Sequence, residues 1–234
     1  MNRNAPRAPE ITEDVLGRLP LFPLPNAVLF PGTTLPLHLF EPRYRALAEY
    51  CVNGPRVMAL GTLIPGAYSE TPDAVPPIYP ILSVGTIAAD RRLSDGRWDI
   101  ALNGVCRIEL VDDLPSSEPF RFIRARRVRE LERPDDRIAS ELVRSSVVQV
   151  ANLLPALWAQ LSPQLIAATT PSMLADIIAA MFVEGHEDRR RLLEEVHVGK
   201  RLEHLQGVLA GILLDLSVRT RAEKGQSDDR ELLN

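Results

Sequence analysis

The 234-residue sequence has few cysteines and few aromatic residues. Aromatic residues make up 5% of the chain, and Cys51 and Cys106 are its two cysteines. They lie far apart and neither belongs to a CxxC pair, so their spacing does not support a structural zinc site. We expect two free, buried thiols in a reducing cytoplasm.

Lysine is also scarce, and positive charge comes almost entirely from arginine. Lys200 and Lys224 are the only lysines, and the formal net charge is -4. A negative chain has no general electrostatic attraction for nucleic acid or anionic membranes. The arginine-rich segment RFIRARRVR, at residues 121–129, is the one feature that favours RNA. We therefore expect neither a nucleic-acid nor a membrane partner.

The sequence lacks the hydrophobic runs that target or anchor proteins. No stretch approaches the ~20 apolar residues of a membrane-spanning helix. The N-terminal segment MNRNAPRAPEITEDVLG has no apolar core of a secretory signal. We expect a cytoplasmic protein with flexible tails at residues 1–17 and 224–234.

The motifs of common enzymes are absent as well. The sequence contains no GxxxxGK[ST] phosphate loop, no GxGxxG dinucleotide loop and no GxSxG nucleophile motif. The only Glu-x-x-His is Glu194–His197, whereas a carboxylate-bridged di-iron site needs two such motifs. The four histidines do not form a metal-binding pattern; they are His38, His186, His197 and His204. We predict no catalytic residue, no metal and no cofactor.

Residues 18–133 hold most of the prolines and have the pattern of a β domain. Asp95-Gly96 separates two apolar runs and predicts a hairpin turn, and Asn103-Gly104 predicts a second turn or a bulge. The arginines of residues 121–127 indicate an edge strand or a half-exposed strand. One helix is predicted, EPRYRALAEYCVN at 41–53, with Pro42 in its first turn and Gly54 after its end.

Residues 134–223 change to helical periodicity. Pro155 and Pro163 are expected to divide the region into short helices, and Thr170 is expected to cap one of them. The last helix carries apolar residues at heptad spacing, namely Val198, Leu202, Leu205, Leu209, Ile212 and Leu216. This seam either packs on the preceding helices, which we favour, or forms a coiled coil with a partner.

The order of the motifs resembles the N-terminal, substrate-binding domain of Lon proteases. The resemblance rests on LPLFPLPNAVLFPGTTLPLHLFEPRY, SVGTIA, DGRWDIALNGVCRIEL and the helical MLADIIAAMF and RRLLEEVHVGKRLEHLQGVLAGIL. It covers residues 18–218, and LFEPRYR is similar to stand-alone bacterial Lon-domain proteins and to the Lon-like domain of cereblon. It implies an α+β fold in which a β-rich, PUA-like pseudo-barrel precedes an α-helical bundle with a long last helix. Full-length Lon continues into an ATPase and a Ser–Lys peptidase, neither of which we expect within these 234 residues.

The resemblance implies a non-catalytic module that binds polypeptide segments, such as unfolded or misfolded protein in quality control. Apolar residues of the first segment are candidates to line a peptide groove, namely Phe22, Phe30, Phe40 and Tyr44; the alternative for each is core packing. Glu41, Arg43 and Arg107 are candidates for a structural ion pair that ties the helix start to the barrel. The competing hypothesis is an adaptor that acts through its heptad helix on a protein partner or on itself, and the oligomeric state stays open.

Overall fold

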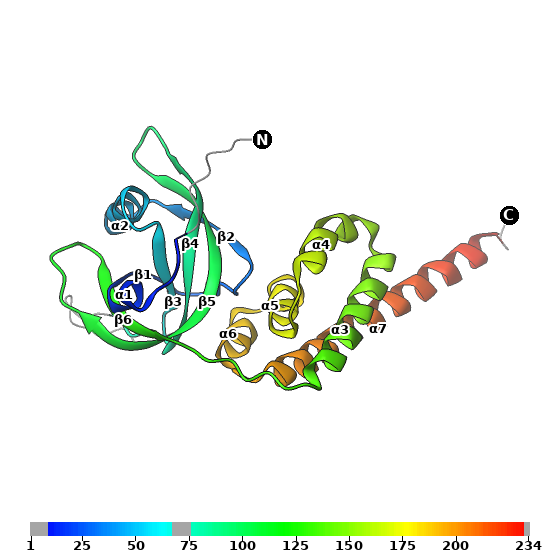
Figure 1. Cartoon of the computed structure of the whole chain (residues 1–234). Helices are drawn as coiled ribbons and strands as arrows, with labels where there is room; N and C mark the ends of the chain where they lie inside the picture. The colour runs from blue at the N-terminus through cyan, green and yellow to red at the C-terminus, as the bar shows by residue number, and fades with distance from the viewer. Residues whose placement is uncertain (1–8, 67–75, 232–234) are drawn as a thin grey trace. The chain divides into compact units, whose positions relative to one another are not determined.

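The computed structural model describes residues 9–66 and 76–231. They form two compact units, shown in Figure 1. The β unit comprises Met1–Arg129 and Glu184–Val196, and the helical unit comprises Glu130–Val183 and His197–Asn234. The predicted α+β class is confirmed, because a β-rich half precedes helices that end in one long helix.

A single mixed sheet closes on itself in the β unit. Its elements are α1 (Glu13–Gly17), β1 (Leu19–Leu24), β2 (Thr34–Leu39), α2 (Pro42–Asn53), β3 (Val57–Thr62), β4 (Ile81–Arg92), β5 (Trp98–Leu114), β6 (Arg121–Arg127) and α6 (His186–Glu194). The strands are ordered β2-β5-β4-β3-β1-β6, and β6 also pairs with β5. Five strands therefore make a closed ring, namely β5, β4, β3, β1 and β6. β2 lies outside this ring and pairs with the first half of β5. The β1–β3 pair is parallel and the other pairs are antiparallel.

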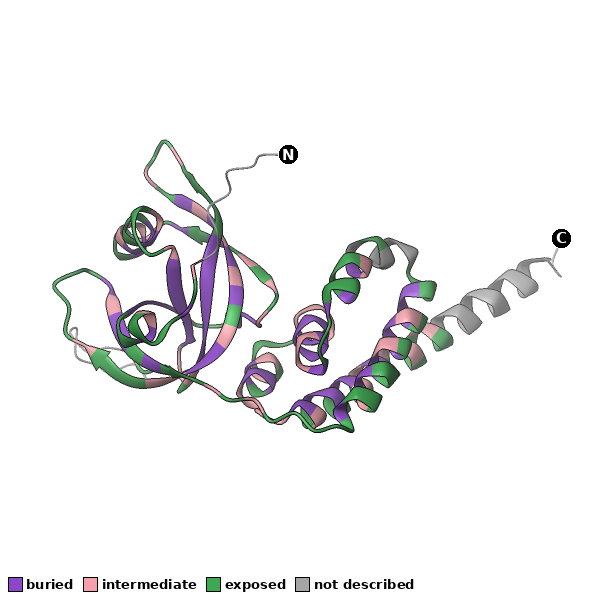
Figure 2. Cartoon of the chain, viewed as in Figure 1, coloured by how far each residue is buried: buried purple, intermediate pink, exposed green. Residues whose placement is uncertain are grey.

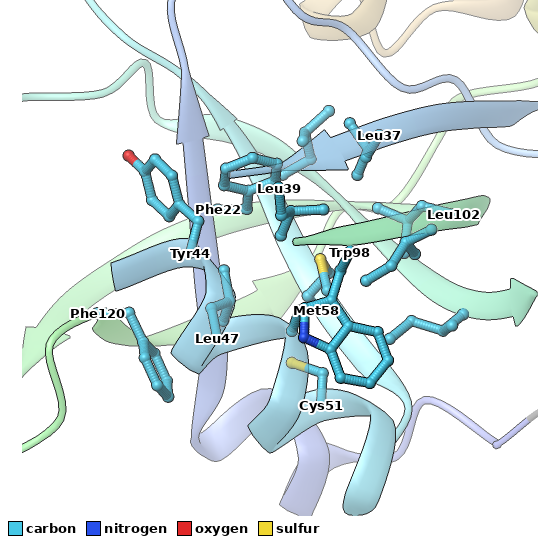
Figure 3. Close-up of a cluster of buried hydrophobic side chains, with 14 of the residues drawn as sticks. Phe22, Leu37, Leu39, Tyr44, Leu47, Cys51, Met58, Trp98, Leu102 and Phe120 are labelled. Carbon is cyan, nitrogen blue, oxygen red and sulfur yellow. The ribbon is translucent and has the colours of Figure 1, made fainter. Parts of the chain in front are cut away.

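The central strands are buried on both faces, because each face lines one of two apolar cores. In β3, Met58 and Leu60 join a core around α2, while Val57 and Ala59 join a second core that includes Leu16 of α1. Alternating side chains of a strand point to opposite faces, so two covered faces explain a continuous apolar run. Figure 2 shows the resulting burial along the ring, and Figure 3 shows the α2-side core.

Both cysteines are free thiols. Cys51 is buried on α2 within the α2-side core, where burial raises the pKa of its thiol to about 12. Cys106 on β5 is only half-buried. At neutral pH the Cys51 thiol is therefore protonated and unreactive.

A bulge in β5 lets one long strand serve both cores. Leu102 faces the α2-side core and Ile108 faces the α1-side core, although both positions are even-numbered. The register explains the switch: Gly104 pairs with Gly85 and Cys106 pairs with Val84, which leaves Val105 as an extra residue. One inserted residue reverses which face the following side chains occupy. The expected turn or bulge at Asn103-Gly104 is thus a bulge within a continuous strand.

Gly104 also provides the space in which the chain after β1 crosses the sheet. A Cβ placed on Gly104 would lie 2.2 Å from the backbone oxygen of Phe30. The Gly104 N–H donates to the Thr33 oxygen at 2.9 Å, and the Gly32 N–H donates to the Gly104 oxygen at 2.9 Å. The crossing segment is therefore hydrogen-bonded to the bulge at a distance that any side chain would prevent.

Other local signals of the β unit appear where the sequence places them. Gly96 has a φ of 83° in the β4–β5 turn, a value that favours glycine. Helix α2 has Pro42 in its first turn and Gly54 as its C-cap. In contrast, β6 lies between β1 and β5, so it is an interior strand with a partly exposed face and not an edge.

The expected N-terminal tail is partly folded. Thr12 caps α1 by accepting a hydrogen bond from the Val15 N–H, and Ile11 and Leu16 are buried in the α1-side core. Ile11 and Leu16 supply apolar burial that offsets the entropy of ordering this segment. Residues 1–8 lie outside the described part of the chain.

The helical unit consists of α3 (Asp136–Leu153), α4 (Pro155–Ala167), α5 (Pro171–Phe182) and α7 (Val198–Glu231). The Thr170 side chain accepts a hydrogen bond from the Met173 N–H, as expected of an N-cap. Pro163 does not end a helix, contrary to expectation, but lies inside α4. Helix α7 extends through residues 224–231, which were expected to be a tail.

A buried arginine joins three segments of the helical unit. Arg201 on α7 is 1% exposed and contacts the Asp176 carboxylate at 2.6 Å and the Glu130 carboxylate at 2.6 Å. It also donates to the Ser172 hydroxyl at 3.0 Å. A buried charge is tolerated when it is paired and hydrogen-bonded, so this cluster fixes α5 and α7 against the chain before α3.

Substitution of Gly104 tests the crossing. We expect Gly104→Ala to lower the free energy of unfolding by about 1–3 kcal/mol, because the added methyl group displaces the backbone at Phe30. Urea unfolding followed by tryptophan fluorescence measures the change. Gly17→Ala is the control, since no atom lies within 4 Å of a Cβ placed there. Equal stability of the two variants would contradict the close crossing.

Candidate functional site

A surface hollow with a volume of about 730 Å³ lies beside Tyr44. It is bounded by the start of α2, by β1 and by the connection from β5 to β6. Its apolar lining comes from Leu21, Pro23, Tyr44, Leu114, Pro115, Pro119 and Phe120. Its polar lining comes from Arg43, Asp113, Ser116, Glu118 and Arg121. We call this hollow the Tyr44 groove.

The Tyr44 ring is held in one orientation by three neighbours. The Phe22 ring meets it edge to face with centroids 4.6 Å apart, and the Tyr44 hydroxyl donates to the Pro23 oxygen at 3.3 Å. The Arg43 guanidinium lies 4.5 Å from the ring centroid, within cation–π range. Burial raises the pKa of Tyr44 above its ordinary value of 10.0, although the positive charge of Arg43 opposes this shift. At neutral pH the groove thus has a rigid, uncharged aromatic wall.

Two ion pairs lie at the groove, and Glu118 adds an exposed carboxylate to its lining. Arg121 donates from Nε to Asp113 Oδ1 and from Nη2 to Asp113 Oδ2, both at 2.9 Å, and its Nη1 donates to the Pro76 oxygen at 2.9 Å. Arg43 pairs with Glu41 at 2.9 Å. These pairs are partly exposed, so they orient side chains more than they stabilise the fold. The groove consequently presents apolar surface between paired charges.

The four aromatic candidates separate into different environments. Phe22 and Phe30 are buried in the β unit, where they pack as core residues. Tyr44 is mostly buried and lines the Tyr44 groove. Phe40 is 59% exposed and stacks near His38, with ring centroids 6.2 Å apart. The structure therefore does not bring all four to one surface, and their role in peptide binding stays a prediction.

The three ion-pair candidates also occupy two places. Glu41 and Arg43 pair with each other at the start of α2. Arg107 is 1% exposed on β5, and its Nε donates to the Leu193 oxygen of α6 at 2.9 Å. Nearby, the Arg190 guanidinium of α6 lies 3.9 Å from the Tyr79 ring centroid. Arg107 thus connects the ring to α6, whereas the α2 start has a local pair.

Three of the four arginines of β6 face acidic partners on β5. Arg121 pairs with Asp113, Arg124 with Asp112, and Arg126 with Glu109 at 2.7 Å. Each pair joins adjacent strands, where opposite charges attract across the ladder. The fourth arginine, Arg127, donates to the Ile11 oxygen at 2.9 Å, so most of the positive charge of β6 is paired within the fold.

The heptad seam of α7 begins inside the helical unit and ends near its surface. Val198, Leu202, Leu205 and Leu209 are buried. Ile212 and Leu216 are half-exposed. Helix α7 packs on α3 and α5, which accounts for the buried part of the seam.

Comparison with known proteins identifies the fold and the family. The family model described as "ATP-dependent protease La (LON) substrate-binding domain" matches residues 18–211. The chain belongs to this family of Lon substrate-binding domains. It has the fold of the N-terminal domain of Lon protease from the Mycobacterium avium complex, with a TM-score of 0.63, 18% identity, and coverage of 82% of this chain and 98% of that chain. A Lon N-terminal domain protein from Xanthomonas campestris gives a TM-score of 0.56 at 20% identity, with coverage of 81% and 97%.

Curated relatives of this Lon-domain chain are much longer. It is 27% identical over 194 residues to a Lon protease of Anaeromyxobacter dehalogenans, which covers 82% of this chain and 23% of the relative. It is 29% identical over 224 residues to a Lon protease of Phenylobacterium zucineum, with coverage of 88% and 27%. The chain therefore spans about a quarter of the length of these relatives.

The described part of this Lon-domain chain contains neither a candidate membrane-spanning helix nor a candidate metal-binding cluster. None of its helices is long and apolar enough to cross a membrane. Within the same residues, no group of three or more His, Cys, Asp or Glu side chains is arranged to hold a metal ion.

The far wall of the Tyr44 groove contains none of the site residues predicted from the sequence. This wall is the segment from Asp113 to Arg121, between β5 and β6. Its signal was Pro115 and Pro119, which keep the connection extended and apolar beside charged residues. Only the closed ring brings this segment to α2, which lies more than sixty residues earlier in the sequence.

The buried Tyr44 hydroxyl predicts a specific pH dependence. The neutral phenol is favoured in the fold, so its contribution is fully present below the ordinary pKa of 10.0 and is lost as the pH rises through the higher folded value. We expect Tyr44→Phe to lower the free energy of unfolding by about 1 kcal/mol at pH 7. Above the ordinary tyrosine pKa, the variant should lose less stability with rising pH than the wild type.

Urea unfolding across neutral and alkaline pH measures both effects. Tyr50→Phe is the matched control, because Tyr50 is 40% exposed. The same alkaline slope for wild type and Tyr44→Phe would contradict the assignment.

Proposed function

We propose that this chain is a non-catalytic recognition module that binds polypeptide segments, including unfolded or misfolded protein. Membership of the Lon substrate-binding family is the observation that carries the proposal. The proposed setting is protein quality control in the cytoplasm. The proteolytic and ATPase activities of the longer relatives are not part of it.

The Tyr44 groove is the proposed contact surface for the polypeptide. Its volume of about 730 Å³ is within the range of ordinary ligand pockets, and its walls combine aromatic, leucine and proline surface. Proline and aromatic walls are rigid, so little conformational entropy is lost when a segment docks on them. The two ion pairs at the rim cancel one another, so the exposed Glu118 carboxylate is the main charge that the lining adds to its apolar surface. An extended segment with apolar side chains suits this lining best.

The chemistry of the groove supports binding without catalysis. The Tyr44 hydroxyl donates to a backbone oxygen, and the Asp113 carboxylate receives two bonds from Arg121. A nucleophile needs a base within hydrogen-bond reach, and general acids and bases need a proton to exchange with substrate. The Tyr44 hydroxyl and the Asp113 carboxylate are each engaged in hydrogen bonds within the protein, so they hold the groove wall in place.

Charge placed in the groove tests the proposal. We expect Leu114→Asp to weaken binding of fluorescein-labelled, reduced and carboxymethylated α-lactalbumin by about tenfold, the worth of one lost leucine contact. Pro119→Asp should act in the same direction without altering the core, because Pro119 is exposed. Fluorescence anisotropy measures the affinity, and circular dichroism verifies folding.

Val111→Asp is the matched control. Val111 is 46% exposed on the same strand but does not line the groove, and the substitution adds the same charge. No binding by folded wild-type protein would refute the proposed function. Equal effects of Leu114→Asp and Val111→Asp would refute its location.

A second function, as an adaptor, is favoured by the exposed apolar residues of α7. Leu214 is 64% exposed, Val218 is also exposed, and Ile212 and Leu216 beside them are half-exposed. Residues at i and i+4 share one helix face, so Leu214 and Val218 form a stripe that suits a helical partner or a second copy.

Light scattering over a range of protein concentrations tests self-association. If α7 pairs with a second copy, the apparent mass rises with concentration, and the double variant Leu214→Glu, Val218→Glu stays monomeric. Ile138→Glu on α3 is the control, since it changes an exposed apolar residue outside α7. A wild-type mass that is monomeric at every concentration would contradict self-association.

A further inference from the structure

The outer edge of β2 lies outside the closed ring. β2 ends the strand order, and among the described residues it pairs only with β5. Every strand of the ring itself has at least two neighbours. An unpaired edge presents backbone donors and acceptors in a row that another strand can use.

The register fixes which residues of β2 present these groups. Thr34 is opposite Asn103, and the Gly104 N–H donates to the Thr33 oxygen. Thr34 and Asn103 are therefore a non-hydrogen-bonded pair of the antiparallel ladder. Hydrogen-bonded and non-hydrogen-bonded pairs then alternate along β2. Leu35, Leu37 and Leu39 therefore bond to β5, while the backbone groups of Thr34, Pro36 and His38 face outward.

Pro36 distinguishes between two occupants of this edge. A strand added antiparallel to β2 would exchange two hydrogen bonds with each of Thr34 and His38, but only one with Pro36, which has no N–H. A second copy of β2 would bring its own Pro36. Pairing between two copies would therefore lack two N–H donors, whereas pairing with a strand that has no proline would lack only one. The edge therefore favours a segment of another polypeptide over a copy of itself.

The surface beside the edge indicates the chemistry of that segment. A hollow of about 410 Å³ lies on the exposed face of β2, β5 and β4. Pro36 lines it at the β2 side, while Ala101 and Ala89 line it further from the outer edge. The charges around it are already balanced, since Asp99 contacts His38 at 2.7 Å and Arg91 at 2.6 Å. On this face the side chains of an added strand would lie beside Thr34, Pro36 and His38, and long ones would reach over Pro36 into the hollow. Uncharged, apolar side chains fit this surface.

We propose that the outer edge of β2 captures an extended, apolar segment of another polypeptide as an added antiparallel strand. Backbone hydrogen bonds supply sequence-tolerant affinity in this mode of recognition, and the flanking hollow supplies a preference for apolar side chains. The proposal rests on the polypeptide-binding function and adds to it a second contact surface, separate from the Tyr44 groove.

A pair of substitutions at His38 separates backbone from side chain. His38→Pro removes the outward N–H, whereas His38→Ala keeps it, and both lose the contact with Asp99. We expect His38→Pro to bind labelled, reduced and carboxymethylated α-lactalbumin about two- to tenfold more weakly than His38→Ala, the worth of one backbone hydrogen bond. Hydrogen exchange by NMR should show that the probe slows the Thr34 and His38 amides of the wild type.

Pro36→Ala keeps the test decisive if His38→Pro fails to fold. It restores an outward donor, so we expect about two- to tenfold tighter binding of the same probe. It should also increase self-association in light scattering, because copies could then pair without losing donors.

The outcomes separate the two proposals. Wild-type protein that binds the probe, with equal affinity of the two His38 variants and unprotected β2 amides, would overturn the β2 proposal alone. An unchanged affinity of Pro36→Ala would also count against it. A folded wild type that binds no probe would overturn the proposed function itself.

Discussion

The β unit depends on one close approach between two backbones. The segment after β1 crosses the sheet at Gly104, where its hydrogen bonds to the β5 bulge leave no room for a Cβ. The same bulge turns the second half of β5 toward the opposite core. One long strand can therefore pair with β4, β2 and β6 and line two apolar cores. The closed ring follows from this arrangement, and so does the position of the groove between α2 and the β5–β6 connection.

Helix starts, caps and turns were predicted correctly from the sequence, because each depends on a few neighbouring residues. Pro42 in the first turn of α2, Thr170 as an N-cap and Gly96 in the hairpin are examples. The family resemblance supplied the overall architecture. Pro163 illustrates the limit, because the helical surroundings of α4 accommodate a residue that usually ends a helix.

Long-range features were harder to predict, because they depend on which strands become neighbours. Phe22 and Phe30 are apolar like Phe40, and only the folded ring determines that the first two are core and the third is exposed. Arg107 was a candidate for an ion pair at the start of α2, and in the fold its Nε donates to the Leu193 carbonyl of α6. The groove wall at 113–121 carried no periodic pattern and was overlooked. Burial and pairing across the sheet decided each of these cases.

The place of α6 in the chain has a consequence for biosynthesis. This helix belongs to the β unit but follows α3, α4 and α5 in the sequence. During synthesis, the Arg107 side chain emerges long before the carbonyl of Leu193 that receives its hydrogen bond. The ring must wait for most of the helical unit to be translated before α6 reaches it. The order in which the ribosome releases the chain is thus not the order in which the two units can be completed.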